Sequence, residues 1–190
     1  SRECAAAAQA KGAHFLDAPI SGGPVGANTG TLSIMVGGTQ EAFDLAFDYL
    51  SMMGANVKLM GPTGAGTAMK LINQLLVGVN TVAAAEAFTL ANSAGVDIQV
   101  AADLLAVSWG GSTMVERSAP ITASRAFANS GAPLRLIHKD LTIIKQLASD
   151  ESLSLDLTRI AQGMYDSMME SGKYESDISA VIQLIEERSK

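Results

Sequence analysis

The first third of the chain alternates short apolar runs with segments of helical spacing, and glycine or proline residues separate them. Apolar runs of this length predict buried strands, and apolar residues at helical spacing over residues 41–53 predict a helix. The predicted strands cover residues 14–19, 31–36 and 57–60. Strands that alternate with helices are typical of an α/β layer. Three strands form only part of a doubly wound sheet, so we expect the C-terminal strands of a Rossmann-type sheet here.

The rest of the chain has only helical spacing. Residues 67–94 contain no proline and no paired glycines, which predicts one helix of about 28 residues, or about 42 Å. Beyond Gly95 further helices are predicted, with Pro120 among the residues expected to separate them. The expected fold class is therefore α/β followed by all-α. Residues 1–66 form the end of the Rossmann-type domain, and residues 67–190 form a helical bundle domain that begins with a long interdomain helix.

Composition narrows the class of protein. Of the 190 residues, 48% are hydrophobic and 17% charged, which favours a folded chain with a substantial core. The net charge of -6 argues against a nucleic-acid partner, which needs a basic surface. The single cysteine, Cys4, cannot form an internal disulfide, so a reducing compartment such as the cytoplasm is expected. No uninterrupted apolar run reaches about 18 residues, so we expect no membrane partner.

The N-terminal residues and the motif content suggest a longer protein. Residues 1–10 have the pattern of the end of an amphipathic helix, and no Gly-x-Gly-x-x-Gly loop follows a predicted strand. Such a loop binds the pyrophosphate of a dinucleotide. We therefore expect any dinucleotide-binding half to lie upstream of Ser1.

A first polar island lies at residues 17–27, after a predicted strand. Gly22 and Gly23 can adopt conformations barred to other residues, which lets successive N–H groups point at one anion. The hydroxyl of Ser21 adds a donor. This pattern predicts a site for a small carboxylate. The alternative is an ordinary loop, in which Asp17 and Ser21 bond only to local backbone.

A second polar island lies at the start of the long helix. At about 100° per residue, a set of polar residues shares a sector of roughly 120°: Lys70, Asn73, Gln74, Asn80 and Thr81. In a semi-buried cleft, Lys70 loses hydration, which lowers its pKa toward the range useful for proton transfer. Asn73 or Gln74 would hold a substrate hydroxyl, and Gly64 and Gly66 permit close approach to the helix start. The alternative is a solvated stripe with a snorkelling lysine.

Other chemistry-bearing residues give weaker signals. Lys139 can reach a negatively charged or carbonyl-bearing ligand, whereas Asp140 near a helix N-terminus suits a structural role. His138 has only His14 as a companion, so no metal site is expected. Trp109 is expected in the core, with pocket lining as the alternative.

These segments resemble the β-hydroxyacid dehydrogenase family, which includes 3-hydroxyisobutyrate dehydrogenases and tartronate semialdehyde reductases. The match covers essentially the whole chain, and several spaced motifs in order are more specific than any one of them. The matching segments are 15–23 (FLDAPISGG), 30–38 (GTLSIMVGG), the Gly64-x-Gly66-x-x-x-Lys70-x-x-Asn73-Gln74 motif and Lys139-Asp140-Leu141.

The resemblance implies roles for individual residues. The Ser-Gly-Gly turn would hold the substrate carboxylate, the helix lysine would be the general acid/base, and the following amide would contact the reacting hydroxyl. The lysine of Lys-Asp-Leu would lie near the nicotinamide of NAD or NADP. These roles fall on Ser21, Gly22, Gly23, Lys70, Asn73 and Lys139. The family often has Asn four residues after the lysine, where this chain has Gln74, so both amides remain candidates.

The implied function is oxidation or reduction of a small 3-hydroxy acid, of the 3-hydroxyisobutyrate or 2-hydroxy-3-oxopropionate type, by a homodimer or homotetramer. Two alternatives stay open. One is a non-catalytic binding or dimerisation module derived from such an enzyme. The other is an enzyme like 6-phosphogluconate dehydrogenase, which would need clustered basic residues for a phosphate. Only Arg117, Arg125, Arg135 and Lys139 stand near candidate pocket segments.

Overall fold

The computed structural model describes residues 1–128 and 131–189, and it consists of two compact units. Unit 1 is Ser1–Asn73 and unit 2 is Gln74–Lys190. The sequence pattern placed the boundary after Gly66, whereas the structure divides after Asn73. The difference arises because the first turns of the long helix α4 (Ala65–Ser93) pack with the sheet of unit 1.

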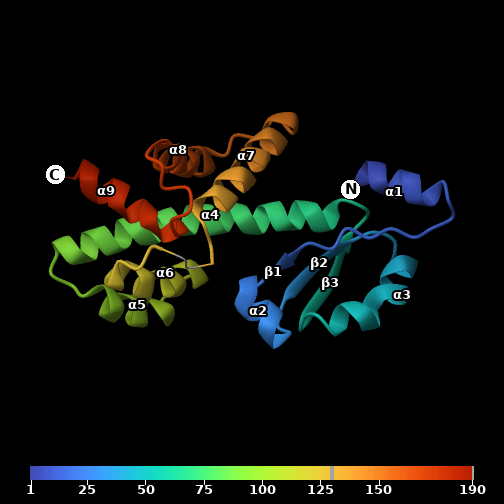
Figure 1. Cartoon of the computed structure of the whole chain (residues 1–190), viewed down its shortest axis with the longest axis horizontal. Coiled ribbons are helices and arrows are strands. Elements are labelled where there is room, and N and C mark those ends of the chain that lie inside the picture. The colour runs from blue at the N-terminus through green and yellow to red at the C-terminus, as the bar shows by residue number, and fades with distance from the viewer. Residues whose placement is uncertain (129–130, 190) are drawn as a thin grey trace. The chain divides into compact units, whose positions relative to one another are not determined.

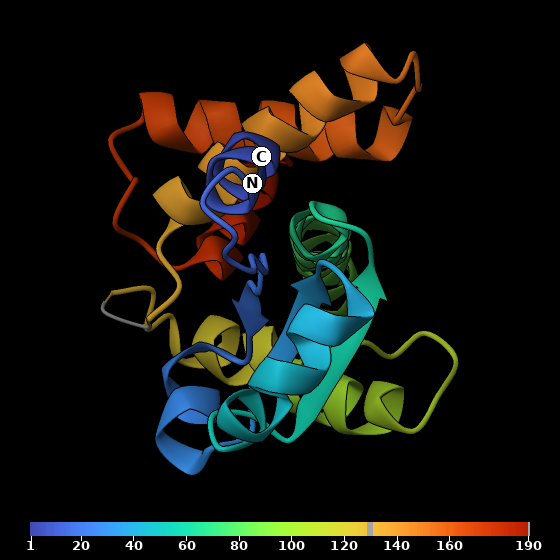
Figure 2. The ribbon, with the colours of Figure 1, turned by 90° about the vertical axis from the view of Figure 1, so that its right-hand side faces the viewer.

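Unit 1 is an α/β layer with a three-stranded sheet in the order β1-β2-β3 (Figure 1). β1 pairs with β2 in the antiparallel direction, and β2 pairs with β3 in parallel. Helix α3 covers one face of this sheet (Figure 2), and its apolar residues pack on Ile34 and Val36. Besides the start of α4, the elements are α1 (Arg2–Gln9), β1 (Ile20–Ser21), α2 (Gly23–Thr29), β2 (Ser33–Gly37), α3 (Gln40–Ser51) and β3 (Asn56–Gly61).

One prediction for unit 1 was wrong in detail, and one helix was missed. The predicted strand at residues 14–19 makes only an isolated bridge between Asp17 and Gly37, and the regular strand is β1, beyond Pro19. Proline lacks the N–H that a continuous ladder needs, although the Pro19 carbonyl accepts a bond from Met35 N. Helix α2 was not predicted at all. Its signal was the proline near its start and the left-handed Gly30 at its end.

The start of α4 lies against the sheet because Gly66 has no side chain. A Cβ at Gly66 would overlap the carbonyl oxygens of Met35 and Asp17. The sequence suggested that glycines here let a ligand approach the helix. The structure shows that the backbone of unit 1 itself makes the close approach, so Gly66 has a packing role.

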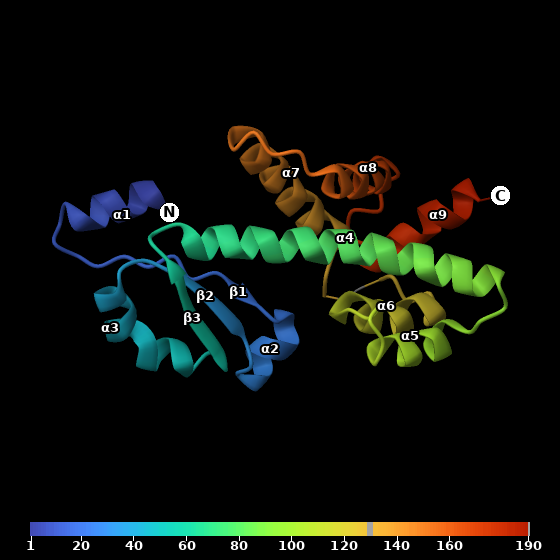
Figure 3. The same cartoon turned by 180° about the vertical axis from the view of Figure 1, so that it is seen from behind.

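Unit 2 is all-helical, and α5 lies beside α6 and α7 beside α8 (Figures 1 and 3). Further helices lie beyond Gly95, as predicted, and α4 belongs to both units. The remaining elements are α5 (Ile98–Ala106), α6 (Thr113–Ser124), α7 (Leu134–Asp150), α8 (Asp156–Glu170), the 3-10 helix η1 (Ile178–Val181) and α9 (Ile182–Arg188).

One predicted helix break is wrong. Pro120 lies inside α6, which continues to Ser124 and ends at Arg125 in a left-handed conformation. A buried face of α6 that includes Val115 and Ala119 explains why the helix tolerates the lost N–H. The bidentate ion pair between Arg117 and the fully buried Asp177, with distances of 3.0 and 2.6 Å, ties the same helix to the segment before η1.

Within unit 2, α4 packs closely on α7 and α8. Gly78 faces Leu141, whose side-chain atoms would lie 3.1 to 3.4 Å from an added Cβ. The buried Tyr165 of α8 donates its hydroxyl to Gly78 O at 3.2 Å, and burial raises the pKa of this phenol. Thr81 is 0% exposed and bonds to Val77 O, so this part of the predicted polar stripe lies in the core.

The apolar residues of α4 are not all buried. Ile72, Leu76 and Leu90 are each more than half exposed. By length and composition, α4 is the one helix in the described part of the chain that meets the criteria for a membrane span. The core helix of a soluble protein meets the same criteria, and the lack of a membrane partner stays a prediction.

Candidate functional site

The Ser-Gly-Gly segment forms the junction between β1 and α2 in unit 1. Gly22 has φ 127° and Gly23 has φ 59°, and side-chain-bearing residues rarely adopt these conformations. A Cβ at Gly22 would also lie 3.3 Å from Leu32 Cδ2. The backbone conformation predicted from the sequence is therefore present, and it requires glycine for both reasons.

The junction presents backbone donors at the start of α2. The first N–H groups of a helix have no intrahelical acceptor, and Pro24 contributes none. Gly26 N already donates to Gly22 O at 2.9 Å, which leaves Gly23 and Val25 as the early helical N–H donors for another acceptor. Ser21 is partly buried beside them, at the end of β1. This arrangement can donate several hydrogen bonds to a carboxylate.

Asp17 has a structural role that the sequence did not indicate. Its carboxylate is 7% exposed and caps the start of α4, accepting from Gly64 N at 2.6 Å, Thr67 N at 2.7 Å and Thr67 Oγ1 at 2.9 Å. The alternative of purely local bonding, considered for Asp17 on sequence grounds, is therefore wrong. No local signal identifies this cap, since its partners lie 47 and 50 residues further along the chain.

The hydrogen bonds of Asp17 decide its ionisation. Burial by itself raises the pKa of a carboxyl group, but the bonds from Gly64 N, Thr67 N and Thr67 Oγ1 outweigh it and hold the pKa of Asp17 below its ordinary value. Asp17 is therefore an ionised cap at neutral pH. A negative charge at this position also complements the positive end of the α4 dipole.

Lys70 and Asn73 lie on the first turns of α4, and both are partly buried, which is compatible with a cleft and with the alternative of a snorkelling lysine. The contact between Gly66 and Met35 connects these turns of α4 to the glycine junction through the sheet, and the two steps of this connection can be estimated. Met35 N bonds to Pro19 O, and Ser21 follows two residues later, about 7 Å along an extended chain. Lys70 follows Gly66 by one turn, about 6 Å. That Lys70 and the junction bind the same molecule stays a prediction.

A second cluster of predicted residues forms in unit 2. Asp140 of α7 accepts from Gln74 Nε2 at 2.6 Å and from Lys139 Nζ at 2.5 Å. The Asp140 side chain is 15% exposed, whereas that of Lys139 is 60% exposed. The structure thus brings Gln74 and Lys139 to one carboxylate. Asp140 lies within α7 and away from its first turn, so the predicted helix-dipole role is replaced by this bridging role.

The other candidates take no part in these clusters. Trp109 is fully exposed, so the expectation of a core tryptophan was wrong. His138 Nε2 lies 2.8 Å from Asp166 Oδ1. Residues 1–128 and 131–189 contain no group of three His, Cys, Asp or Glu side chains suited to a metal.

The arginines considered for phosphate binding are each paired with a carboxylate. Their partners are Asp177 for Arg117, Glu186 for Arg125 and Glu175 for Arg135. Because each guanidinium has its own acidic partner, these residues do not form the basic cluster that a sugar-phosphate site needs.

Comparison with protein families gives two matches that together cover most of the chain. The model for the NAD-binding domain of NADP-dependent 3-hydroxyisobutyrate dehydrogenase matches residues 64–185. The model for the NAD binding domain of 6-phosphogluconate dehydrogenase matches residues 1–61. The two matched segments meet near the start of α4.

Individual proteins give the same picture. The chain is 35% identical to 2-hydroxy-3-oxopropionate reductase of Escherichia coli (strain K12), over 92% of the chain and 60% of the relative. The solved 3-hydroxyisobutyrate dehydrogenase of Salmonella typhimurium has a TM-score of 0.87 and 34% identity, over 96% of this chain and 64% of that one. The Mycobacterium tuberculosis 3-hydroxyisobutyrate dehydrogenase solved with L-serine has a TM-score of 0.86 and 31% identity, over 97% of this chain and 65% of that one. The chain spans about 60% of the length of the curated relatives it matches.

Proposed function

Because the chain belongs to the β-hydroxyacid dehydrogenase family, we propose that it supplies the substrate-binding part of an NAD(P)-dependent enzyme that oxidises or reduces a small 3-hydroxy acid. The relatives are named for 2-hydroxy-3-oxopropionate and 3-hydroxyisobutyrate. Both are small carboxylates. The observation that supports this proposal most strongly is the Gln74–Asp140–Lys139 cluster of unit 2, in which two residues of the family motifs share one carboxylate.

The glycine junction and Lys70 have distinct tasks in the proposed reaction. The N–H groups at the start of α2 and the Ser21 hydroxyl bind the substrate carboxylate, which fixes the orientation of the neighbouring carbons. Lys70 accepts the hydroxyl proton during oxidation and returns it during reduction. Its partial burial is consistent with this task, because a lysine in a cleft is less strongly hydrated than one on the surface.

We propose Gln74 rather than Asn73 as the amide that meets the substrate hydroxyl. The Gln74 Nε2 group is directed to Asp140, which fixes the plane of the amide and the direction of its oxygen. Lys70 and Gln74 are four residues apart on α4 and so share a helix face. Asn73 is turned from that position by one residue, or about 100°.

Lys139 fits the nicotinamide end of a dinucleotide. Its ammonium is fixed at Asp140 while 60% of the side chain stays exposed, so it can meet a carbonyl-bearing ring. When bound, NAD or NADP supplies the hydride chemistry. The chain has no Gly-x-Gly-x-x-Gly loop to hold the pyrophosphate of the same cofactor.

The role of Lys70 is tested by Lys70→Ala in the intact enzyme, assayed with short 3-hydroxy acids and both nicotinamide cofactors. Removing the proton-transfer group is expected to lower kcat roughly 10²- to 10⁴-fold with little change in KM. The matched control is Lys11→Ala, at an exposed turn of unit 1, which should retain full activity. Near-normal kcat in Lys70→Ala would refute the proposed role.

Self-association is a second part of the proposal. An exposed apolar surface, here called the α5 face, consists of Val100, Leu104, Val107 and Trp109. Val100 and Leu104 are four residues apart and lie on one side of α5, and Val107 is the residue that caps the C-terminal end of this helix. Exposed apolar patches of this kind mark protein interaction sites. A homodimer formed through this face is compatible with the proposed enzyme and with a non-catalytic dimerisation module. Measuring enzymatic activity of the intact protein distinguishes these two functions.

A further inference from the structure

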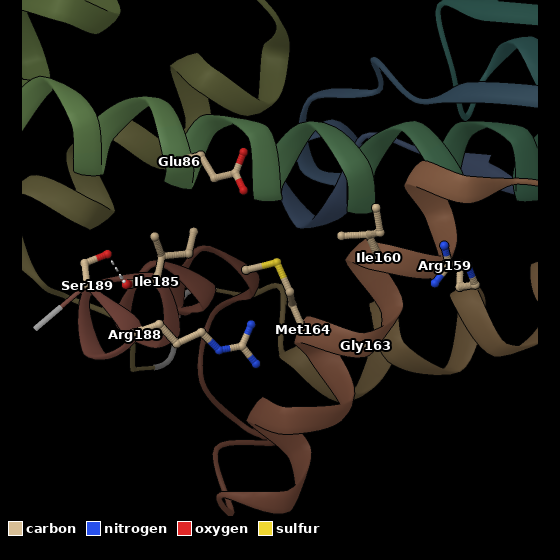
Figure 4. Close-up of a pocket in the computed structure, with 8 residues that line it drawn as sticks. All are labelled: Glu86, Arg159, Ile160, Gly163, Met164, Ile185, Arg188 and Ser189. Atoms are coloured by element: carbon tan, nitrogen blue, oxygen red, sulfur yellow. Dashed lines mark hydrogen bonds between the residues drawn. The ribbon is translucent and has the colours of Figure 1, made fainter.

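A surface pocket of about 510 Å³, open to solvent and here called the cavity, lies in unit 2 between α4, α8 and α9, and its charged residues Glu86 and Arg188 are exposed (Figure 4). None of the residues assigned above to the reaction lines it. Its volume is in the range of cavities that bind small molecules. The side chains that matter for its chemistry are Glu86, Arg159, Ile160, Met164, Ile185 and Arg188.

The cavity places opposite charges on two sides. Figure 4 shows Glu86 reaching from α4, and Arg188 of α9 on the other side of Ile185 and Met164. In the described part of the chain no ion pair joins Glu86 to Arg188. The nearest polar contact of Arg188 is weak, since its Nη2 lies 3.5 Å from Ser167 Oγ. Because Glu86 and Arg188 line one cavity without pairing with each other, each can pair with the opposite charge of a ligand that carries both an ammonium and a carboxylate.

The apolar part of the cavity determines the rest of the ligand. Met164 is buried, while Ile160 and Ile185 retain solvent exposure and so have apolar area to cover. Covering these side chains favours a ligand with a branched hydrocarbon group, in proportion to the apolar area removed from water. Arg159 is at the edge and already lies 3.6 Å from Asp156 Oδ1, which leaves Arg188 as the principal cation.

We propose that this cavity binds a free α-amino acid with an apolar side chain, such as leucine. Arg188 takes the carboxylate, for which a guanidinium offers two parallel donors. Glu86 takes the ammonium, and the side chain of the ligand packs on Ile160, Met164 and Ile185. A phosphate or a simple fatty acid fits less well, because the charge of Glu86 repels an anion that brings no ammonium group.

The test is calorimetric titration of the 190-residue chain with L-leucine, L-leucinamide and N-acetyl-L-leucine. A Kd on the order of 1 mM is expected for leucine, a usual affinity for a ligand of this size. Removing either ligand charge should weaken binding about tenfold. Glu86→Gln should weaken the binding of leucine about tenfold and leave the binding of N-acetyl-leucine unchanged. Arg188→Gln should also weaken the binding of leucine about tenfold, but it should leave the binding of leucinamide unchanged.

The control is Arg135→Gln, which removes an exposed arginine of unit 2 outside the cavity and should bind leucine like the wild type. Circular dichroism verifies that each variant is folded. The proposal is overturned if leucine gives no signal up to about 50 mM, well beyond the expected Kd. It is also overturned if the two analogues that each keep only one charge bind as well as leucine, if neither variant changes binding, or if sedimentation shows a second copy of the chain closing the cavity.

Discussion

At the scale of single residues, Asp140 shows how a carboxylate can organise two neighbours. It is mostly buried, and it accepts hydrogen bonds from Gln74 and from Lys139. Hydrogen bonds to a charged acceptor are stronger and more directional than those between neutral groups. Asp140 is thus a positioning residue in the proposed reaction, since it acts on the substrate only through Gln74 and on the nicotinamide only through Lys139.

Asp140→Asn tests this positioning role in the intact enzyme. Asparagine keeps one acceptor oxygen but loses the negative charge, so one of the two partners loses its fixed position. We expect kcat/KM to fall about tenfold, equivalent to about 1.4 kcal/mol. Substrate and cofactor KM values, measured separately, show which partner is displaced.

A control for this change lies on the same helix. Asp150 accepts from Gln146 Nε2 at 2.7 Å in a similar but exposed pair. Asp150→Asn should leave kcat/KM unchanged. An equal loss in both variants would mean that the effect of Asp140→Asn comes from the stability of α7 and not from positioning.

At the scale of elements, the junction between α4 and the sheet depends on one charged cap. Asp17 supplies the acceptors for two backbone N–H groups and one hydroxyl at the start of α4. The pKa of Asp17 is lowered in the folded state. Its contribution to stability is therefore complete above the unfolded-state pKa of about 4 and is lost as the pH falls through the lower folded-state pKa.

Asp17→Asn is expected to reduce the free energy of unfolding of unit 1 by about 1 to 3 kcal/mol at pH 7. The difference from the wild type should shrink below pH 4, roughly the pKa of an unfolded aspartate, because the unfolded state takes up a proton there while folded Asp17 stays ionised until its lower pKa is reached. Urea unfolding and amide exchange at Thr67, both measured against pH, check this prediction.

The control is Asp44→Asn in α3, where the carboxylate accepts only from Gln40 on the exposed surface. Its effect should stay below about 0.5 kcal/mol at every pH. A pH-independent loss in Asp17→Asn would contradict the proposed ionised cap.

At the scale of the whole molecule, the α5 face is the clearest candidate for self-association. Trp109 and its neighbours expose large apolar side chains that a folded monomer seldom leaves in water. Trp109→Ser is expected to weaken the dimer about 30-fold, the effect of a central interface tryptophan worth about 2 kcal/mol. Sedimentation velocity over a dilution series measures this change.

Leu157→Ser is the matched control, because Leu157 is an exposed leucine of α8 outside the α5 face. It should leave the dimer intact. If wild type and Trp109→Ser were both monomeric at high concentration, the proposed interface would be wrong.

The sequence by itself determined most helices but not α2 or the continuation of α6 through Pro120, and it also determined the α/β character of unit 1 and the glycine conformation at Gly22 and Gly23. These features follow from periodicity and local backbone preference, which neighbouring residues set. The family resemblance also followed from the order of motifs along the chain.

Only the tertiary structure decided which distant groups meet. The cap of α4 by Asp17, the bridge between Gln74 and Asp140, the exposed Trp109 and the persistence of α6 through Pro120 have no local signature. Each depends on side chains or faces that packing alone brings together. Folding creates hydrogen bonds to buried carboxylates and buries one face of a helix. These long-range interactions outweigh the secondary-structure preferences of individual residues.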